Sequence, residues 1–335
     1  MRIWFNHWFS TAYHLINMMR DGLSGNCYVI GSGTNDVSVF RTACDEWHSE
    51  PKELSGEEYA QWCVDFCVEN KIDVFVPRRG LVEIISRAAD FAAAGVKLFA
   101  DDRADIAVQL DDKIQTYKMF SGICPEFIPP VYEAKSLEEF KSAYEALKPH
   151  WDRVCYKLTI DEGARSFRII DPKIDGIYGL YNKPGFKLTY NTACAVLSEY
   201  DFSIPMLVMP YLSGKEYSCD CLATSEGNLI IPRYKTGKRY SIVNFELEIM
   251  DACGKIMDEL QLKMPMNIQF KYEGDRPYLL EINPRMSGGL QLSCKATGIN
   301  LPYIALSQLL GQEEKWEYPD IDEQKVAHIE SPICL

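Results

Sequence analysis

The feature that most constrains the fold is an alternation of short apolar runs and longer amphipathic stretches over the first hundred residues. The β-rich runs are RIWF (2–5), CYVIG (27–31), DVFVP (73–77) and a weaker KLFA (97–100). Between them, residues 56–69 and 80–94 place apolar side chains at i, i+3 and i+4, the spacing of a helix face. Strands that alternate with helices form parallel sheets, because parallel strands need a long crossover. The sequence therefore predicts an N-terminal α/β domain.

Two arginines stand directly after the third of these runs. Arg78 and Arg79 follow DVFVP, at the carboxyl end of a strand, where parallel α/β sheets bind their ligands. Together with basic residues of the 233–239 segment, they are candidates for the lining of an anionic pocket. The alternative is a pair of solvated loop arginines.

From about residue 111 the regular alternation ends, and helices mix with antiparallel strand patterns. Acidic residues open a short helix at 111–120, and residues 154–158 and 166–171 form a hairpin-like pair of strands. Further helices are expected over residues 136–150, 245–262 and, with an interruption near 298–300, 290–311. The predicted fold class is α/β with α+β lobes, divided into domains 1–110, 111–208 and 209–335.

Composition argues against several classes of function. The 335 residues carry a net charge of −13, whereas binding to nucleic acids or anionic membranes needs clustered Lys and Arg. No apolar run reaches the length of a membrane span, and the amphipathic start lacks the pattern of a signal peptide. The twelve cysteines lack zinc-site spacing and are expected to be reduced thiols. These features predict a cytoplasmic protein.

Residues 266–289, MNIQFKYEGDRPYLLEINPRMSGG, read as two short strands around a polar turn. If the turn is centred on residues 274–276, Gln269 lies opposite Glu281 in an antiparallel pair. Because strand side chains alternate between two faces, Gln269, Glu281 and Asn283 then share one face. The opposite face carries the apolar side chains Ile268, Phe270, Leu280 and Ile282. One face covers a core, and the other presents three oxygen-bearing side chains.

The polar face has the chemistry of a magnesium–phosphate site. Mg²⁺ prefers oxygen ligands and, in phosphate chemistry, takes one or two carboxylates together with phosphate oxygens. Arg285 comes two residues after Asn283, and Ser287-Gly288-Gly289 open a helix whose N–H groups attract anions. The alternative is a half-exposed hairpin whose polar residues face water. The order of these residue types on one hairpin favours a metal–nucleotide site.

This segment resembles the metal-binding signature of the ATP-grasp superfamily, most closely that of the carbamoyl-phosphate synthase large-subunit branch. The resemblance lies in the Gln of the first strand, the Glu-x-Asn of the second and the Pro-Arg that follows. It implies a pre-grasp domain followed by two α+β lobes that clasp ATP, in a single grasp unit. It also implies that Gln269, Glu281 and Asn283 bind Mg²⁺ or Mn²⁺, with Gln269 and Glu281 contributing to the ATP site.

The preceding part of the chain keeps the family order. Lys113, in the Asp-Lys pair at 112–113, resembles a lysine that points at phosphates. Lys157 lies between apolar neighbours in a strand pattern and matches the lysine on the α-phosphate side of the nucleotide. A helix-start lysine and a surface strand lysine are the alternatives. Residues 159–165 match the phosphate-covering loop, although Gly163 is the loop's one glycine.

The segment MLVMPYLSGKEYSCD (206–220) resembles the family's connection between the two lobes. The resemblance implies that main chain around Met209, Tyr211 and Leu212 reads the adenine edge, and that Glu216 lies near the ribose. A proline after Met209 replaces an acidic residue that is common in the family. One ribose contact is therefore expected to be missing.

A basic cluster follows in IPRYKTGKRYS. Its members are Arg233, Lys235, Lys238 and Arg239. Similar family positions face the transferred phosphate or a carboxylate substrate. A solvated charge run is the alternative.

The activity implied by the resemblance is that of an ATP-dependent carboxylate–amine ligase. A carboxylate attacks the γ-phosphate to give an acyl phosphate and ADP, and an amine, or less often a thiol, then displaces phosphate. Such chemistry needs alignment and charge neutralisation more than a protein nucleophile. The implied catalytic residues are Lys157, Arg233, Asn283 and Arg285.

The implied partners are a small-molecule carboxylate and an amine, such as an amino acid or short peptide, and not nucleic acid or membrane. Homodimers are common in such folds. Two alternatives remain: activation of bicarbonate, as in carbamoyl-phosphate synthase, and a nucleotide-binding sensor or scaffold without turnover.

Overall fold

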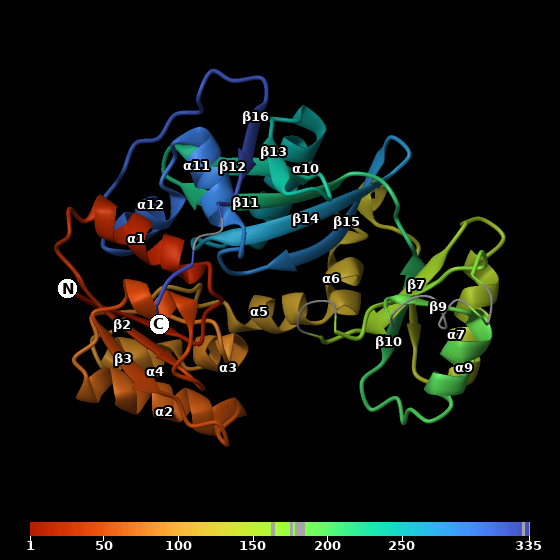
Figure 1. Cartoon of the computed structure of the whole chain (residues 1–335), viewed down its shortest axis with the longest axis horizontal. Helices are drawn as coiled ribbons and strands as arrows, with labels where there is room; N and C mark the ends of the chain where they lie inside the picture. Colours follow the sequence, from red (N-terminus) through yellow and green to blue (C-terminus); the bar gives the residue numbers. More distant parts are fainter. Residues whose placement is uncertain (162–164, 175–176, 178–184, 330–331, 335) are drawn as a thin grey trace. The chain divides into compact units, whose positions relative to one another are not determined.

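The computed structural model describes residues 1–335 except 162–164, 175–176, 178–184, 330–331 and 335. The chain folds into two compact units (Figure 1). The first comprises residues 1–108, 216–269 and 282–335, and the second comprises residues 109–215 and 270–281.

The first unit begins with a parallel sheet in the order β3-β2-β1-β4-β5. Its strands are β1 (Arg2–Asn6), β2 (Tyr28–Gly33), β3 (Glu46–Ser49), β4 (Val74–Val76) and β5 (Lys97–Leu98). The predicted parallel sheet and four of its strands are confirmed. The pattern missed β3, EWHS, because this strand lies at the sheet edge, where half-buried polar side chains replace the apolar run.

Side chains of β1 alternate between two cores. Trp4 packs with Tyr59 and Phe75 on one face, and Ile3 and Phe5 belong to a core on the other. The first face is covered by α2 (Gly56–Glu69), α3 (Leu81–Ser86) and α4 (Ala88–Ala93), and the second by α1 (Ala12–Gly22) (Figure 1).

The single helix predicted over 80–94 is wrong, because the backbone leaves helical geometry at Arg87, with φ −108° and ψ 19°.

The second sheet has the order β15-β14-β11-β12-β13-β16. Its strands are β11 (Glu216–Thr224), β12 (Gly227–Lys235), β13 (Tyr240–Val243), β14 (Met266–Glu273), β15 (Arg276–Asn283) and β16 (Gln324–Ala327). The associated helices are α10 (Leu247–Leu260), α11 (Leu290–Thr297) and α12 (Leu301–Leu309). The interruption predicted near 298–300 is confirmed: Gly298, at φ +77°, ends α11.

The second unit is built on a sheet in the order β6-β10-β7-β8-β9. Its strands are β6 (Tyr132–Ala134), β7 (Val154–Leu158), β8 (Arg168–Ile170), β9 (Lys187–Leu188) and β10 (Met206–Pro210). The helices are α6 (Lys113–Phe120), α7 (Leu137–Leu147) and α9 (Tyr190–Leu197). The predicted pairing of 154–158 with 166–171 is confirmed, since β7 and β8 are antiparallel neighbours.

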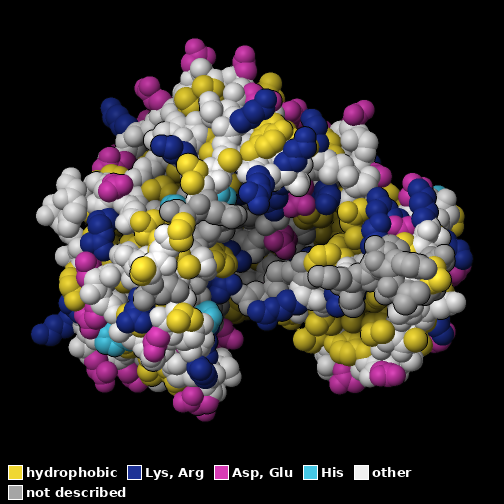
Figure 2. Space-filling view, in the orientation of Figure 1, with side chains coloured by type: hydrophobic (Ala, Val, Ile, Leu, Met, Phe, Trp, Pro, Cys, Tyr) yellow, Lys and Arg dark blue, Asp and Glu magenta, His cyan; other side chains and the backbone are white. Residues whose placement is uncertain are grey.

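The remaining helical segments are α5 and two short 3₁₀ turns. Their bounds are Ala104–Asp111 for α5, Val39–Ala43 for η1 and Pro125–Phe127 for η2. Within the described ranges, no helix combines the length and apolarity needed to cross a bilayer. On the face shown in Figure 2, Lys and Arg side chains are interspersed with Asp and Glu.

A substitution at Phe140, on α7, tests the packing of the core in the second unit. Its side chain is fully buried and packs edge-on against Tyr156, with ring centroids 5.2 Å apart. Phe140→Ala should lower the free energy of unfolding by about 3–5 kcal/mol, because the cavity adds to the lost transfer energy. Urea denaturation followed by circular dichroism measures the change. Val196→Ala, at a side chain that is 57% exposed, should stay within about 0.5 kcal/mol, and equal effects of the two changes would contradict the assignment.

Candidate functional site

Lys113 is held at the start of a helix in the second unit. Asp112 caps α6 by accepting the N–H groups of Ile114 (2.8 Å) and Gln115 (3.3 Å). The cap makes Lys113 the first helical residue. Its Nζ donates to the carbonyl oxygens of Asp111 (3.0 Å) and Asp161 (3.2 Å). The ammonium group is therefore both buried and fixed to the start of the predicted phosphate loop.

Lys157 lies on β7, the central strand of the same sheet. Burial lowers the pKa of Lys157; Lys113 lowers it further, while the Glu281 carboxylate opposes the shift. Lys157 Nζ and Glu281 Oε2 are 4.0 Å apart. A half-buried ammonium group that one carboxylate and a second ammonium group both influence favours the arrival of further negative charge. Phosphate oxygens would supply that charge.

The predicted phosphate loop is closed at its base by a short hydrogen-bond network. The Asp161 carboxylate accepts the Ser166 N–H (2.9 Å) and hydroxyl (2.5 Å). Ser166 Oγ in turn accepts the Leu158 N–H at 2.9 Å. The ends of the loop are thus tied to β7, which also carries Lys157. Gly163, predicted to approach phosphates, lies outside the described residues.

The predicted adenine-reading segment continues past the end of a short strand. β6 pairs with β10 only from Met206 to Val208, so the backbone beyond Val208 has no strand on that side in the described structure. Tyr211 commits its N–H to the carbonyl of Arg153 at 2.9 Å. Leu212 is buried, and no hydrogen bond of its N–H is found among the described residues. The segment has the form of a backbone edge that a planar base can extend.

Cations surround the ring of Tyr211. The Arg153 guanidinium lies 4.4 Å from the ring centroid, and Lys271 Nζ lies 5.5 Å from it. The Phe167 ring is 6.4 Å away, centroid to centroid. Positive charge therefore gathers beside the predicted adenine segment.

Glu216, predicted to lie near a ribose, begins β11. Its carboxylate accepts a 2.6 Å hydrogen bond from Lys235, which ends β12. The neighbouring strands place these residues directly opposite each other. Of the predicted basic cluster, Lys235 is therefore an ion-pair partner within the sheet.

The hairpin that carries the predicted metal ligands differs from expectation at its turn. β14 ends at Glu273 and β15 begins at Arg276, so the turn has two residues and not three. Gly274, at φ +59°, takes the left-handed conformation that a two-residue hairpin loop needs at its first position. The predicted turn therefore included one residue, Arg276, that belongs to β15.

The predicted ligands and the predicted core residues of the hairpin differ in how deeply they are buried. The predicted ligands Gln269, Glu281 and Asn283 are half-buried. The predicted core residues Ile268, Phe270 and Ile282 are buried. Leu280 is an exception: it is half-buried, and the continuous buried run on β15 is Pro277–Leu279. The Leu280 carbonyl accepts a hydrogen bond from the Tyr117 hydroxyl at 2.8 Å.

The donor set suits a hard cation. All three predicted ligands offer oxygen, and Glu281 supplies one carboxylate. The Gln269 amide N donates to Asn267 Oδ1 at 3.1 Å, which orients its oxygen away from Asn267. Asn283 Oδ1 accepts from Arg285 at 3.5 Å. Among the described residues, no group of three or more His, Cys, Asp or Glu side chains is placed to hold a metal.

A buried polar network lies in the same sheet. Asp220 on β11 is 2% exposed, and its carboxylate accepts from Ser287 (2.7 Å), Ser293 (2.6 Å) and the Asn267 amide (3.1 Å). Sequence reasoning missed Asp220. The signal for it was an aspartate in the middle of the otherwise apolar run CDCLA.

Arg233, predicted to face the transferred phosphate, is also in this network. It is 4% exposed and donates to Ser293 Oγ (3.2 Å) and Ser218 Oγ (3.3 Å). The alternative of a solvated charge run is therefore wrong for Arg233. Its guanidinium therefore links α11, which carries Ser293, to β11, which carries Ser218.

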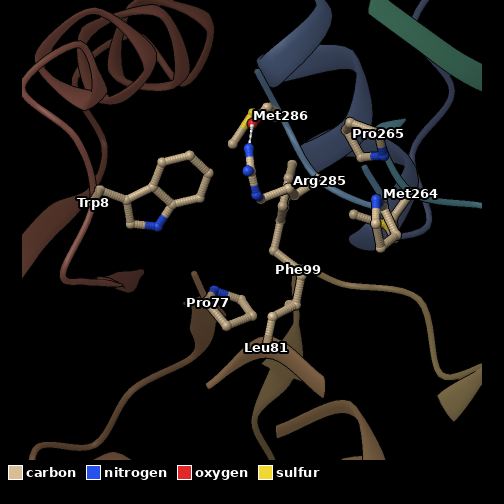
Figure 3. Close-up of a pocket in the computed structure, with 9 residues that line it drawn as sticks. Trp8, Pro77, Leu81, Phe99, Met264, Pro265, Arg285 and Met286 are labelled. Carbon is tan, nitrogen blue, oxygen red and sulfur yellow. Dashed lines mark hydrogen bonds between the residues drawn. The ribbon is translucent and has the colours of Figure 1, made fainter. Parts of the chain in front are cut away.

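Arg285 lines a small pocket in the first unit. Figure 3 shows its side chain among Trp8, Pro77 and Met286. Its guanidinium lies 5.4 Å from the centroid of the Phe9 ring, and the Arg78 guanidinium lies 4.2 Å from the same centroid. The tertiary fold thus brings Arg78, from the carboxyl end of the parallel sheet, to the same aromatic ring as Arg285.

Gly289 gives a test of the buried network. A Cβ at Gly289 would lie 2.3 Å from Arg233 Nη2, whereas a Cβ at Gly288 would meet its nearest atom, Thr11 Oγ1, at 3.7 Å. Gly289→Ala should displace the guanidinium and lower the free energy of unfolding by about 1–3 kcal/mol, because buried donors lose their partners. Gly288→Ala is the matched control and should be close to neutral. Chemical denaturation of both variants decides, and equal stability would contradict the role of Arg233.

The lowered pKa of Lys157 predicts a pH-dependent trade-off. Between the lowered pKa and the usual lysine value of about 10.4, the folded protein binds fewer protons than the unfolded chain, so stability rises with pH. Lys157→Met should therefore be more stable than the wild type at pH 7, and the difference should shrink towards pH 10. Denaturation over this pH range measures it. A variant less stable than the wild type at pH 7 would contradict the assignment.

Comparisons with known proteins find similarity to an ATP-grasp family and to carbamoyl phosphate synthase large chains. The model of a family described as "ATP-grasp in the biosynthetic pathway with Ter operon" matches residues 202–332. The carbamoyl phosphate synthase large chain of Clostridium acetobutylicum is 24% identical over 220 residues, 61% of this chain and 19% of that protein. The arginine-specific large chain of Geobacillus stearothermophilus is 29% identical over 134 residues, 35% of this chain and 13% of that protein. The chain thus spans about a fifth or less of these curated relatives.

Solved structures share the fold across almost the whole chain. The biotin carboxylase domain of Hydrogenobacter thermophilus 2-oxoglutarate carboxylase, solved as a dimer with MgADP, ADP and bicarbonate, has a TM-score of 0.66 at 16% identity, covering 96% of this chain and 72% of that chain. N5-carboxyaminoimidazole synthetase from Staphylococcus aureus has a TM-score of 0.65 at 11% identity, covering 95% and 78%. These matches show that the chain shares the fold of these proteins, that its residues 202–332 match an ATP-grasp family, and that it is similar in sequence to carbamoyl phosphate synthase large chains.

Proposed function

We propose that the protein is an ATP-dependent carboxylate–amine ligase that works through an acyl phosphate. The observation that carries the proposal is the placement of Glu281. Its carboxylate lies 4.0 Å from Lys157 Nζ and shares its strand with Asn283, two residues further on. A cation ligand beside a buried ammonium group is what a magnesium-bound polyphosphate needs.

The proposed binding residues fall into three groups, which would hold the metal ion, the phosphates and the nucleoside. Magnesium or manganese, when bound, neutralises phosphate charge, and its ligands would be Gln269, Glu281 and Asn283. Lys113 and Lys157 would contact phosphate oxygens, with backbone of the Gly163 loop covering them. Residues proposed for the nucleoside are Met209, Tyr211, Leu212 and Glu216. For Tyr211 the contribution is its ring, because its N–H is already bonded to Arg153.

The chemistry proposed for the chain's own residues is alignment and charge compensation. Lys157 and Arg285 would stabilise charge that develops as a carboxylate attacks the γ-phosphate. Asn283 would act as a ligand, and Arg233 would act by holding the loop before α11 in place. The proposal needs no covalently loaded side chain.

The wider predictions are part of the same proposal. Segments 1–110, 111–208 and 209–335 would be the pre-grasp domain and the two grasping lobes. The substrates would be a small carboxylate and an amine, in a cytoplasmic enzyme that forms a homodimer. Light scattering on the purified full chain measures the last of these.

Glu281 provides the direct test. Glu281→Gln should reduce magnesium-dependent ADP formation on the order of 100-fold, because a neutral amide replaces the one carboxylate of the donor set. Asp275→Asn, at the exposed tip of the same hairpin, is the matched control and should keep wild-type activity. The measurement is coupled ADP release with a panel of carboxylates and amines. Equal activity of the two variants would refute the metal role.

A second candidate activity is the phosphorylation of bicarbonate. It is favoured by the likeness to carbamoyl phosphate synthase large chains. ADP release that depends on bicarbonate alone would support it against the carboxylate–amine ligase. Tight binding of Mg-ATP without ADP release under any condition would instead indicate a nucleotide sensor.

A further inference from the structure

The N-terminal sheet has a switch point that the proposed ATP site does not use. In the order β3-β2-β1-β4-β5, the chain runs outward in one direction from β1 and in the other from β4. Open α/β sheets bind ligands at the carboxyl ends of the strands where the order reverses. Here the residues at those ends are His7, directly after β1, and Arg78, shortly after β4.

His7 occupies a strained position at the end of β1. Its φ of +40° lies in the left-handed region, which non-glycine residues adopt only rarely. Its N–H donates to the Ser32 carbonyl at 2.8 Å, which holds it beside the end of β2. Ring atom Nδ1 is buried without a hydrogen bond and lies 4.0 Å from Glu50 Oε2. The side chain is nevertheless 39% exposed, so the other edge of the ring reaches solvent.

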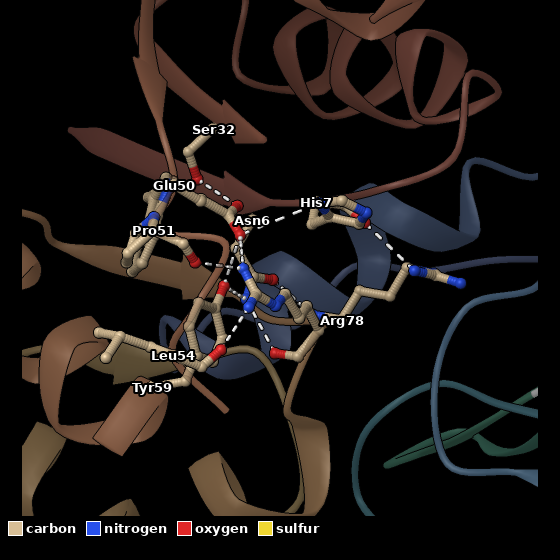
Figure 4. Close-up of polar contacts among 10 residues, drawn as sticks. Asn6, His7, Ser32, Glu50, Pro51, Leu54, Tyr59 and Arg78 are labelled. Carbon is tan, nitrogen blue, oxygen red and sulfur yellow. Dashed lines mark hydrogen bonds and ion pairs between the residues drawn. The ribbon is translucent and has the colours of Figure 1, made fainter. Parts of the chain in front are cut away.

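Glu50 follows β3 directly and its carboxyl group is held by several hydrogen bonds. Its side chain is fully buried and accepts from Ser32 (2.8 Å), Tyr59 (2.9 Å) and Arg79 (3.1 Å). Figure 4 shows this network next to His7. A buried carboxylate that faces Nδ1 leaves Nε2, on the other edge of the ring, as the nitrogen available to a ligand.

The loops after β1 and β4 are locked together by Asn6. Its Oδ1 accepts the Arg78 N–H at 2.6 Å, and its Nδ2 donates to the Arg79 carbonyl at 2.9 Å. The Arg78 guanidinium donates to the His7 carbonyl at 3.2 Å and extends outward past His7 (Figure 4). The charged groups that face His7 are therefore Glu50, Arg78 and, behind Glu50, Arg79.

Side-chain contacts link this edge of the sheet to Asn283, a proposed metal ligand on β15. Arg78 and Arg285 contact the same Phe9 ring, and Arg285 contacts Asn283. We infer that His7 and Arg78 form the site of the second substrate: an amine that carries its own anionic group, a carboxylate or a phosphate. Arg78 binds the anion, and His7 binds the amine. The inference rests on the proposed ligase function.

In this site His7 acts as the base for the amine. The nitrogen lone pair forms the C–N bond to the acyl carbon while the C–O bond to phosphate breaks, and that electron pair leaves with inorganic phosphate. The proton lost from nitrogen passes to His7 Nε2, on the ring edge away from Glu50. Glu50 stabilises the resulting imidazolium as a positioning residue.

Binding is tested without turnover. The full chain with Mg²⁺ and a non-hydrolysable ATP analogue is titrated with each of the twenty amino acids, with their carboxamides and with phosphoethanolamine. At least one anionic amine should bind, and its neutral counterpart should bind about 10–100-fold more weakly. Arg78→Gln should lose this discrimination, Arg78→Lys should keep most of it, and Arg41→Gln, at an exposed arginine, should match the wild type. Absence of binding by every probe, or binding that Arg78→Gln leaves unchanged, overturns the inference.

The base role is tested with a nucleophile that does not depend on a base from the protein. Hydroxylamine is reactive enough to attack an acyl phosphate in water and to release its proton to solvent, so hydroxamate formation, assayed over a panel of amino acids and dicarboxylates, reports the first step alone. His7→Asn, chosen because asparagine tolerates φ above zero, should reduce amide formation about 100–1000-fold and leave hydroxamate formation within roughly threefold of wild type. His150→Asn, at an exposed histidine, is the control. Equal loss of both products in a folded His7→Asn overturns the base role, whereas anionic amine binding without any hydroxamate in the wild type refutes the ligase proposal instead.

Discussion

The buried carboxylate of Asp220 is the constraint on which the site in the first unit depends. A charge in the interior is tolerated only when hydrogen bonds replace its water. Asp220 obtains them from Ser287, Ser293 and Asn267, which come from the loop before α11, from α11 and from β14. Asn267 in turn orients Gln269. The geometry of the proposed metal face is therefore set by a residue that is not a ligand.

The second unit shows the same principle with the opposite charge. Lys157 is held in an environment that disfavours its ionised form, with Lys113 adding to the effect. The charged form of Lys157 therefore lowers the free energy of unfolding, and the positive charge is in place before a ligand binds. A polyphosphate would find its counter-charges already desolvated and oriented, so little reorganisation opposes binding.

Local pattern predicted most elements but not their exceptions. Period-two alternation separated Gln269 and Glu281 from the buried side chains, and helix spacing located α2 and α10. The pattern missed β3, since an edge strand needs no apolar run, and joined α3 to α4, since nothing local marks the break at Arg87. It also left a solvated charge run open for Arg233, because burial of a long polar side chain depends on partners that lie far along the chain.

The sequence by itself determined the strand–helix alternation, the cap at Asp112 and the order Gln, Glu-x-Asn, Pro-Arg that resembles the ATP-grasp signature. All of these are set by neighbours within a few residues. Only the tertiary structure decided that Arg78 and Arg285 both lie near the Phe9 ring. It also decided that Asp220 accepts a hydrogen bond from Ser293 and that Glu50 lies beside His7. These contacts depend on the order of strands in the sheets and on the paths of the loops. Both bring together residues that are far apart in the sequence, so a local pattern cannot predict them.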